Sequence, residues 1–146
     1  MIETIRRALL LILAAGLIGV ELELLLLDHT EDPWQWTPII LIAIALVVLG
    51  WHAFHRGAAS VRAVQVVMGL FVVAGFLGLY LHFDGNIVFE KEVAPDAKSW
   101  PLIWAALRGA TPTLAPGAMI QLGLIGLLYT YRHPARNTAN GEAVSR

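Results

Sequence analysis

The 146-residue sequence contains no cysteine and few charged side chains. Without cysteine the chain cannot form disulfide bonds, thiolate metal sites or a thiol nucleophile. Charged residues make up 14% of the chain, whereas about 25% is usual in soluble domains. The net charge is −1, so no basic field attracts nucleic acid, and we expect no nucleic-acid partner. The sequence also lacks a nucleophile-elbow motif and a Walker phosphate loop, which argues against an enzyme.

Apolar residues dominate instead, at 58% of the chain, and they gather into four long runs. Runs of about 20 apolar residues are typical of transmembrane helices, so we predict an all-α membrane protein, a bundle of four transmembrane helices. The predicted spans are 8–27, 39–54, 63–83 and 117–131. They form one domain, 1–134, and we expect a disordered cytoplasmic tail at 135–146. The first run is too long for a signal peptide and no cleavage site follows it, so we expect it to be retained.

Prolines and aromatic residues mark the ends of the two shorter spans. Pro38 is expected at the first helical position of the second span, and Pro116 opens the fourth. Both spans are short for a hydrocarbon core of about 30 Å, so aromatic side chains are expected to extend them into the interface. These side chains are Trp34, Trp36, Trp51, Tyr129 and Tyr131.

Basic residues predict the orientation. If the chain crosses the membrane four times, seven of the ten basic residues fall on the side of both termini. They are Arg6, Arg7, Arg56, Arg62, Arg132, Arg136 and Arg146. The positive-inside rule places this side in the cytoplasm, so we expect a multi-pass protein of the cell (inner) membrane.

Residues 15–23 and 74–82 resemble each other, each with two glycines and a polar residue on one helix face. This pattern fits a parallel repeat of two helical hairpins, although apolar helices also match by coincidence, and the sequence leaves both explanations open. Small residues let membrane helices approach closely, so we expect the glycine faces to pack within the bundle. The glycines are Gly16, Gly19, Gly75 and Gly78.

Polar side chains gather near the outer ends of the first and third spans. They are Glu21, Glu23, Asp28, His29, Tyr80 and His82. A charge at the bilayer centre costs about 2.5–3.5 kcal/mol, so carboxylates there are expected to be paired, protonated, metal-bound or hydrated. We expect Glu23 and His82 to form an ion pair that fixes helix register. The alternative is a proton relay or a divalent-metal site with Glu23, His82 and His29 as ligands.

Histidines near both ends of the spans suggest a third arrangement. His29 and His82 lie at the outer ends, and His52, His55 and His133 at the inner ends. Histidines at two depths on facing helices are what a four-helix b-type cytochrome needs. Their positions beside arginines and at the lipid boundary favour interfacial histidines over haem ligands.

The long outer loop, 84–115, carries an acidic stretch and then a short helix, Ser99–Gly109. Trp100 and Trp104 share one side of this helix, so we expect it to lie in the outer interface, to cap the bundle as a lid or to meet a partner protein. The leading functional interpretation is an accessory or structural subunit, in a homo-oligomer or a larger membrane complex. For this subunit we expect no cofactor. The alternative is a proton- or divalent-metal-transport component, and the third is a haem-binding electron carrier.

Overall fold

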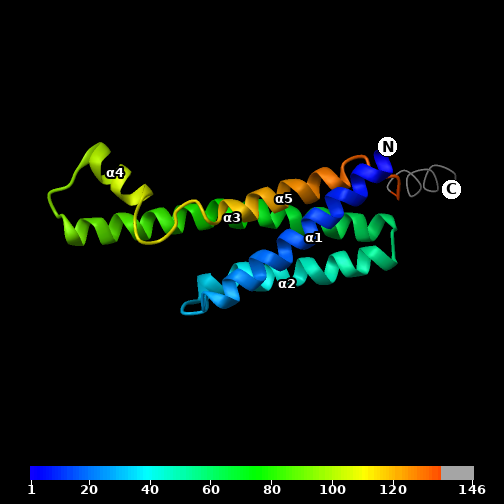
Figure 1. Cartoon of the computed structure of the whole chain (residues 1–146), viewed down its shortest axis with the longest axis horizontal. Coiled ribbons are helices and arrows are strands. Elements are labelled where there is room, and N and C mark those ends of the chain that lie inside the picture. Colours follow the sequence, from blue (N-terminus) through cyan, green and yellow to red (C-terminus); the bar gives the residue numbers. More distant parts are fainter. Residues whose placement is uncertain (136–146) are drawn as a thin grey trace.

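The computed structural model describes residues 1–135, which form five α-helices and no strand (Figure 1). The helices are α1 (Ile2–Leu26), α2 (Pro33–Phe54), α3 (Ala58–Val93), α4 (Ser99–Leu107) and α5 (Gly117–Thr130). Three of them, α1, α2 and α3, are long and apolar enough to cross a membrane, whereas α5 has 14 residues. The predicted tail lies outside the described residues from residue 136 onward.

The exposed surface of the long helices is apolar. In α1, which has 25 residues, only Leu13 and Leu17 are buried, while large side chains such as Leu11 and Ile12 remain exposed. A continuous apolar surface of this kind is unfavourable in water and is suited to contact with lipid. The three long apolar helices therefore fit a small integral membrane protein.

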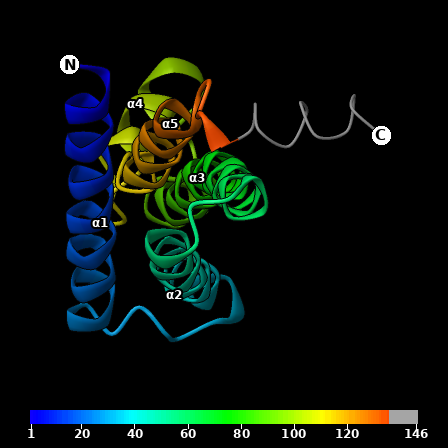
Figure 2. The same ribbon diagram turned by 90° about the vertical axis from the view of Figure 1, so that its right-hand side faces the viewer.

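α5 lies between α1 and α3, and α2 packs against both α1 and α3 on another side (Figure 2). α1 runs obliquely across the others, from the end of α5 to the start of α2 (Figure 1). The core where these helices meet contains Leu13, Leu17, Ile42, Met68, Phe71 and Leu122. The glycine-bearing helices α1 and α3 therefore pack mainly through α5 rather than directly against each other.

Three of the four singled-out glycines contact α5 or the residue before it. A Cβ at Gly16 would lie 2.5 Å from the Leu122 side chain, and one at Gly75 2.9 Å from the Ile120 backbone nitrogen. At Gly78 it would lie 2.8 Å from Pro116. Gly19 differs from the expectation, because a Cβ there would meet no atom within 4 Å. Its side of α1 faces away from the neighbouring helices.

Two glycines that sequence reasoning did not single out complete the contact between α3 and α5. A Cβ at Gly123 would lie 2.7 Å from the Met68 carbonyl oxygen, and one at Gly126 would overlap the Met68 side chain. Gly123 and Gly126 are three residues apart on one helix face, a spacing that indicates a close helix–helix contact.

Several helices extend beyond their predicted spans, including α2 at its start and α3 at its outer end. α2 begins at Pro33, because the Asp32 side chain accepts hydrogen bonds from the backbone nitrogens of Trp34 (2.7 Å) and Gln35 (3.2 Å). Pro38 therefore lies inside the helix rather than at its first position. α3 continues to Val93 instead of ending at residue 83, and its 36 residues span about 54 Å at 1.5 Å per residue.

The outer part of α3 forms a hairpin with α4, which we call the outer hairpin (residues 84–107). α4 occupies most of the predicted short helix, but it packs against α3 rather than over the ends of the other helices (Figure 1). The lid interpretation is therefore wrong. The outer hairpin lies at the end of the molecule far from the N-terminus (Figure 1).

Candidate functional site

A buried histidine joins three helices near the inner end, the end that holds the N-terminus and the α2–α3 connection. The His52 ring on α2 lies with Nδ1 2.8 Å from Ser60 Oγ of α3 and Nε2 2.7 Å from Tyr129 Oη of α5. His52, Ser60 and Tyr129 are all buried. Tyr129 thus differs from the expectation of an interfacial aromatic residue, whereas Tyr131 is exposed.

The hydrogen bonds around His52 define its tautomer. Ser60 Oγ donates to the backbone carbonyl of His55 or Gly57, so its single proton is engaged and it accepts from His52 Nδ1–H. His52 Nε2 then carries no proton and accepts from the Tyr129 hydroxyl. Both ring nitrogens of His52 have hydrogen-bond partners, so neither is free to ligate haem iron or another metal.

His133 and Arg6 extend this cluster towards the end of the molecule that holds the N-terminus. The His133 ring packs edge-on against His52, with ring centres 5.5 Å apart. Arg6 Nη2 donates to the carbonyl oxygens of Tyr131 (3.1 Å) and Arg132 (2.9 Å), which follow α5. Burial, followed by the positive charge of Arg6, lowers the pKa of His133 below its ordinary value. Sequence reasoning missed Ser60 and Tyr129, although a tight turn after α2 was a signal that His52 and Ser60 lie side by side.

The outer polar residues do not form the expected ion pair. His82 Nδ1 lies 2.9 Å from the Pro112 carbonyl oxygen, to which it donates. Glu23 is exposed, and the one ion pair within residues 1–135 joins Arg7 and Glu3 at 3.8 Å. Glu23 and His82 are therefore not paired in this structure. His82 instead bonds to the backbone of Pro112, a residue that nothing in the sequence places beside it.

Among the remaining outer residues, His29 lies close to His82, and Tyr80, Asp28 and Glu21 differ in exposure. The rings of His29 and His82 approach each other, with centres 6.5 Å apart. Tyr80 and Asp28 are exposed, and Asp28 has a φ of 49° at the end of α1. Glu21 is half-buried, and its Oε2 atom is buried without a hydrogen-bond partner. The matched positions of the proposed repeat, such as Glu21 and Tyr80, thus have different surroundings.

A metal ion would need several of these groups at one place. Among the described residues, no group of three or more histidine, aspartate or glutamate side chains lies close enough to hold one. In particular, Glu23 does not join His29 and His82 as a third ligand. The structure thus offers at most a pair of neighbouring imidazoles at the outer end.

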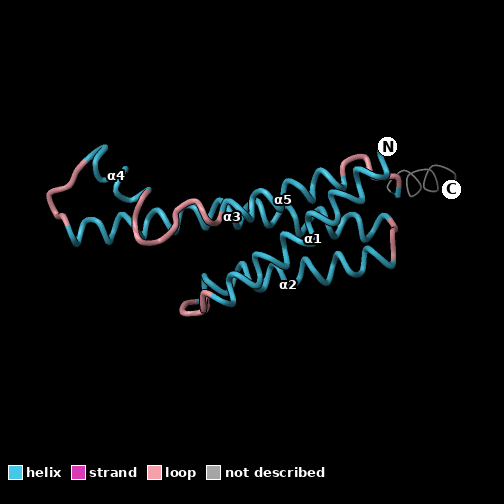
Figure 3. The backbone as a smooth tube through the Cα atoms, in the orientation of Figure 1, coloured by secondary structure: helices cyan, strands magenta, loops and turns pink. Residues whose placement is uncertain are grey.

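Asn86, one helical turn beyond His82, holds the outer hairpin and the chain that follows it. Its Nδ2 atom lies within hydrogen-bond distance of the carbonyl oxygens of Ala106 (2.9 Å) and Thr111 (2.7 Å) and of Thr113 Oγ1 (3.0 Å). Its Oδ1 accepts from the Thr111 backbone nitrogen at 3.1 Å. The segment between α4 and α5 is thereby fixed along α3 (Figure 3).

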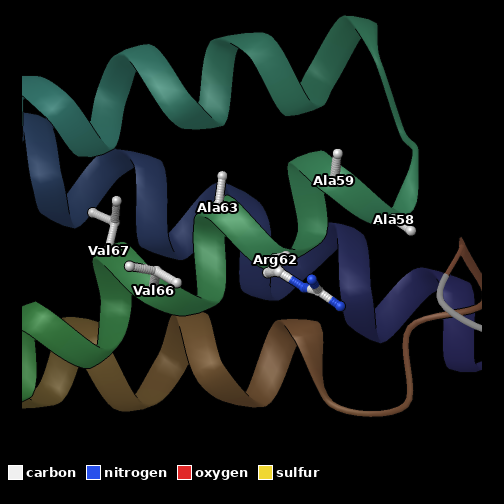
Figure 4. A pocket seen from close by; sticks show the side chains of 6 residues that line it. All are labelled: Ala58, Ala59, Arg62, Ala63, Val66 and Val67. Carbon is white, nitrogen blue, oxygen red and sulfur yellow. The ribbon is translucent and has the colours of Figure 1, made fainter.

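A hollow of about 580 Å³ lies on the inner part of α3 (Figure 4). It is lined by Ala58, Ala59, Arg62, Ala63, Val66 and Val67. Arg62 is its single charged side chain, and no other polar group converges on it, so it is not suited to catalysis. The polar constellations at the two ends are the candidate sites. No family model, curated protein or solved structure matches the chain.

Proposed function

We propose that this chain is a four-crossing accessory or structural subunit of a membrane assembly, with both termini in the cytoplasm. The outer hairpin is the part that contacts the partner. Three observations support this proposal: the path of the chain before α5, the position of the arginines, and the surface of the outer hairpin.

The fourth crossing combines a short helix with an extended segment. The 14 residues of α5 span about 21 Å, less than a hydrocarbon core of about 30 Å. Residues 109–116 continue along α3 beyond α5 (Figure 3). Non-helical backbone at membrane depth is tolerated where protein groups satisfy it, and His82 and Asn86 bond to the carbonyl oxygens of Pro112 and Thr111.

The arginines support the orientation. Arg6 and Arg7 of α1 and Arg56 after α2 line one pocket with His133, so three separate chain segments bring basic groups to the same end. Basic residues favour the cytoplasmic side of a membrane protein. The outer hairpin, at the other end of α3, then projects on the outer side.

The observation that carries the proposal is the rigid, aromatic outer hairpin. Asn86 is buried and ties α3 to the end of α4 and to Thr111. On α4, the rings of Trp100 and Trp104 stack with centres 6.3 Å apart, and both are exposed. A fixed pair of exposed tryptophans is typical of a protein–protein contact, where aromatic residues are enriched.

The experiment measures the size of the assembly after extraction from native membranes in mild detergent. We expect the wild-type chain to migrate well above its monomer, and the double variant Trp100→Ala, Trp104→Ala to migrate as a smaller species. The control, Val73→Ala with Phe76→Ala, removes exposed side chains from the apolar span of α3 and should keep the larger species. A wild-type chain that migrates as a monomer, or equal losses in both double variants, would contradict the proposal.

Asn86→Leu provides a second test of the same surface, because it keeps both tryptophans but removes the bonds that position them. We expect it to weaken the assembly and to make Lys91 and Lys98, which flank the α3–α4 connection, more susceptible to trypsin. An Asn86→Leu variant that resists trypsin and keeps the full assembly would show that the rigidity of the outer hairpin is irrelevant.

One observation favours the transport alternative. Glu21 Oε2 is buried without a hydrogen-bond partner, and such a carboxyl group in a membrane helix is typical of proton or cation pathways. In proteoliposomes, a proton or divalent-metal flux that Glu21→Gln abolishes, while Glu3→Gln leaves it intact, would support transport. Equal flux in all variants and in empty liposomes would exclude it.

A further inference from the structure

We propose that a pocket at the inner end of the helices binds a phosphate group, such as the headgroup of an anionic phospholipid. The pocket lies between α1, the turn after α2 and the end of α5. This inference rests on the proposed orientation, with both termini in the cytoplasm, but not on the partner contact, because the pocket lies at the opposite end of the molecule from the outer hairpin.

The residues around the pocket favour an anion. Arg6, Arg7, Arg56 and His133 line it, and Glu3 is the one carboxylate among the lining residues. Glu3 lies 3.8 Å from Arg7, one helical turn away, so it balances at most one of the three arginines. The pocket volume of about 80 Å³ is enough for several waters, since one needs about 10–15 Å³, and it therefore has room for a tetrahedral oxyanion.

Arg6 is fixed in position before any ligand arrives. Its Nη2 atom donates to two carbonyl oxygens beyond α5, at 3.1 and 2.9 Å. Its Nη1 atom is buried without a hydrogen-bond partner. A guanidinium held this way carries a positive charge that forms no ion pair with a carboxylate of residues 1–135, and an anion in the pocket would compensate it. Because Arg6 covers the Tyr131 and Arg132 carbonyl oxygens, these acceptors do not repel the anion.

His133 lies among these charged groups. Burial lowers the pKa of His133 below its ordinary value, and Arg6 on α1 and Arg56 after α2 lower it further, whereas Glu3 raises it. His52 and Tyr129 pack against its ring. A bound anion would reverse part of this effect, so binding should take up protons and strengthen as pH falls.

The position of the pocket favours an anionic lipid headgroup as the physiological ligand. Basic pockets between helices on the cytoplasmic side of a membrane are suited to anionic headgroups. A free phosphate ion offers the same oxygens, so the experiment must distinguish the two sources of this chemistry.

The experiment titrates three probes into the full chain in an uncharged detergent and measures the rise in unfolding temperature. The probes are short-chain phosphatidylglycerol, the matching phosphatidylcholine and inorganic phosphate. The test variant is Arg56→Gln, since the Arg56 side chain makes no hydrogen bond within residues 1–135, and Arg7→Gln replaces it if Arg56→Gln fails to fold. The control is Arg62→Gln, which removes an arginine from the hollow on α3 (Figure 4).

We expect phosphatidylglycerol to stabilise the wild type more than phosphatidylcholine does, and Arg56→Gln to weaken that binding about fivefold while Arg62→Gln has little effect. Stabilisation by phosphatidylglycerol alone would identify a lipid headgroup as the source, and stabilisation by phosphate alone a soluble anion. No stabilisation by either, or equal weakening in Arg56→Gln and Arg62→Gln, would overturn the proposal.

Discussion

The Nε2 atom of His52 lies 2.7 Å from the Tyr129 hydroxyl and joins α2 to α5. Both side chains are buried, and Ser60 holds the other ring nitrogen. The three residues form a satisfied hydrogen-bonded chain across α2, α3 and α5. Its role is to fix how the inner ends of these helices meet, which agrees with a structural rather than a haem-binding histidine.

Removing the Tyr129 hydroxyl should therefore destabilise the fold. Tyr129→Phe keeps the ring but leaves His52 Nε2 buried without a partner, which costs about 1–3 kcal/mol in the free energy of unfolding. Thermal or chemical unfolding in detergent measures the loss. Tyr131→Phe is the control, because Tyr131 is exposed and the loss of its hydroxyl should change stability little. Equal stability of wild type and Tyr129→Phe would refute the His52–Tyr129 bond.

Alanine at two of the glycines should have opposite effects. A Cβ at Gly75 would lie 2.9 Å from the Ile120 backbone nitrogen and 3.0 Å from the Pro116 carbonyl oxygen, so Gly75→Ala forces α5 away and should cost about 1–3 kcal/mol. Gly19 is open, and Gly19→Ala should be neutral or stabilise by up to about 1 kcal/mol through helix propensity. Unfolding free energies of both variants check this, and a tolerated Gly75→Ala would be inconsistent with the α3–α5 contact.

Glu23→Gln and His82→Ala should be additive in stability. The two residues are not ion-paired, and His82 instead bonds to Pro112, so we expect the double variant to match the sum within about 0.3–0.5 kcal/mol. A double-mutant cycle measures this coupling. A larger coupling would restore the ion pair that the sequence alone suggests.

Two histidines should make the folded state sensitive to acid. Burial lowers the pKa of His29 and of His133, and the nearby His82 and Arg6, respectively, lower it further. The unfolded state then binds protons more readily, so stability is complete above the unfolded pKa of about 6.5 and falls as pH drops through the folded pKa. Unfolding temperatures from neutral to mildly acidic pH measure this fall. His29→Gln with His133→Gln should flatten it, and an unchanged profile in that variant would assign the effect to other groups.

The apolar runs allow the class and most helix positions to be predicted, because three long spans need only length and hydropathy. The end of α3 could not be predicted. Asp84 and Gly85 read locally as a turn, but the helix continues because Asn86 is buried and bonded to Ala106 and Thr111. Tertiary contacts of this kind override local preference.

The polar sites, too, could be predicted only in part. The sequence places Gly75, Gly78 and His82 on one face of α3, and that face does contact α5 and the segment before it. The partner of His82 is the backbone carbonyl of Pro112, which no side-chain pattern can reveal. Glu23 is expected beside His82 because the two residues hold matching positions on the two glycine faces, but its exposure depends on the direction in which α1 crosses the other helices.

The number of membrane crossings is the central claim, and the absence of cysteine makes it directly testable. Single variants Asp96→Cys, Gly57→Cys and Tyr131→Cys report on the outer hairpin, the α2–α3 turn and the end of α5. With a membrane-impermeant maleimide, we predict labelling of Asp96→Cys in intact cells and of the other two only after permeabilisation. Labelling of Tyr131→Cys in intact cells together with Asp96→Cys would show that α5 does not cross, and would contradict the account.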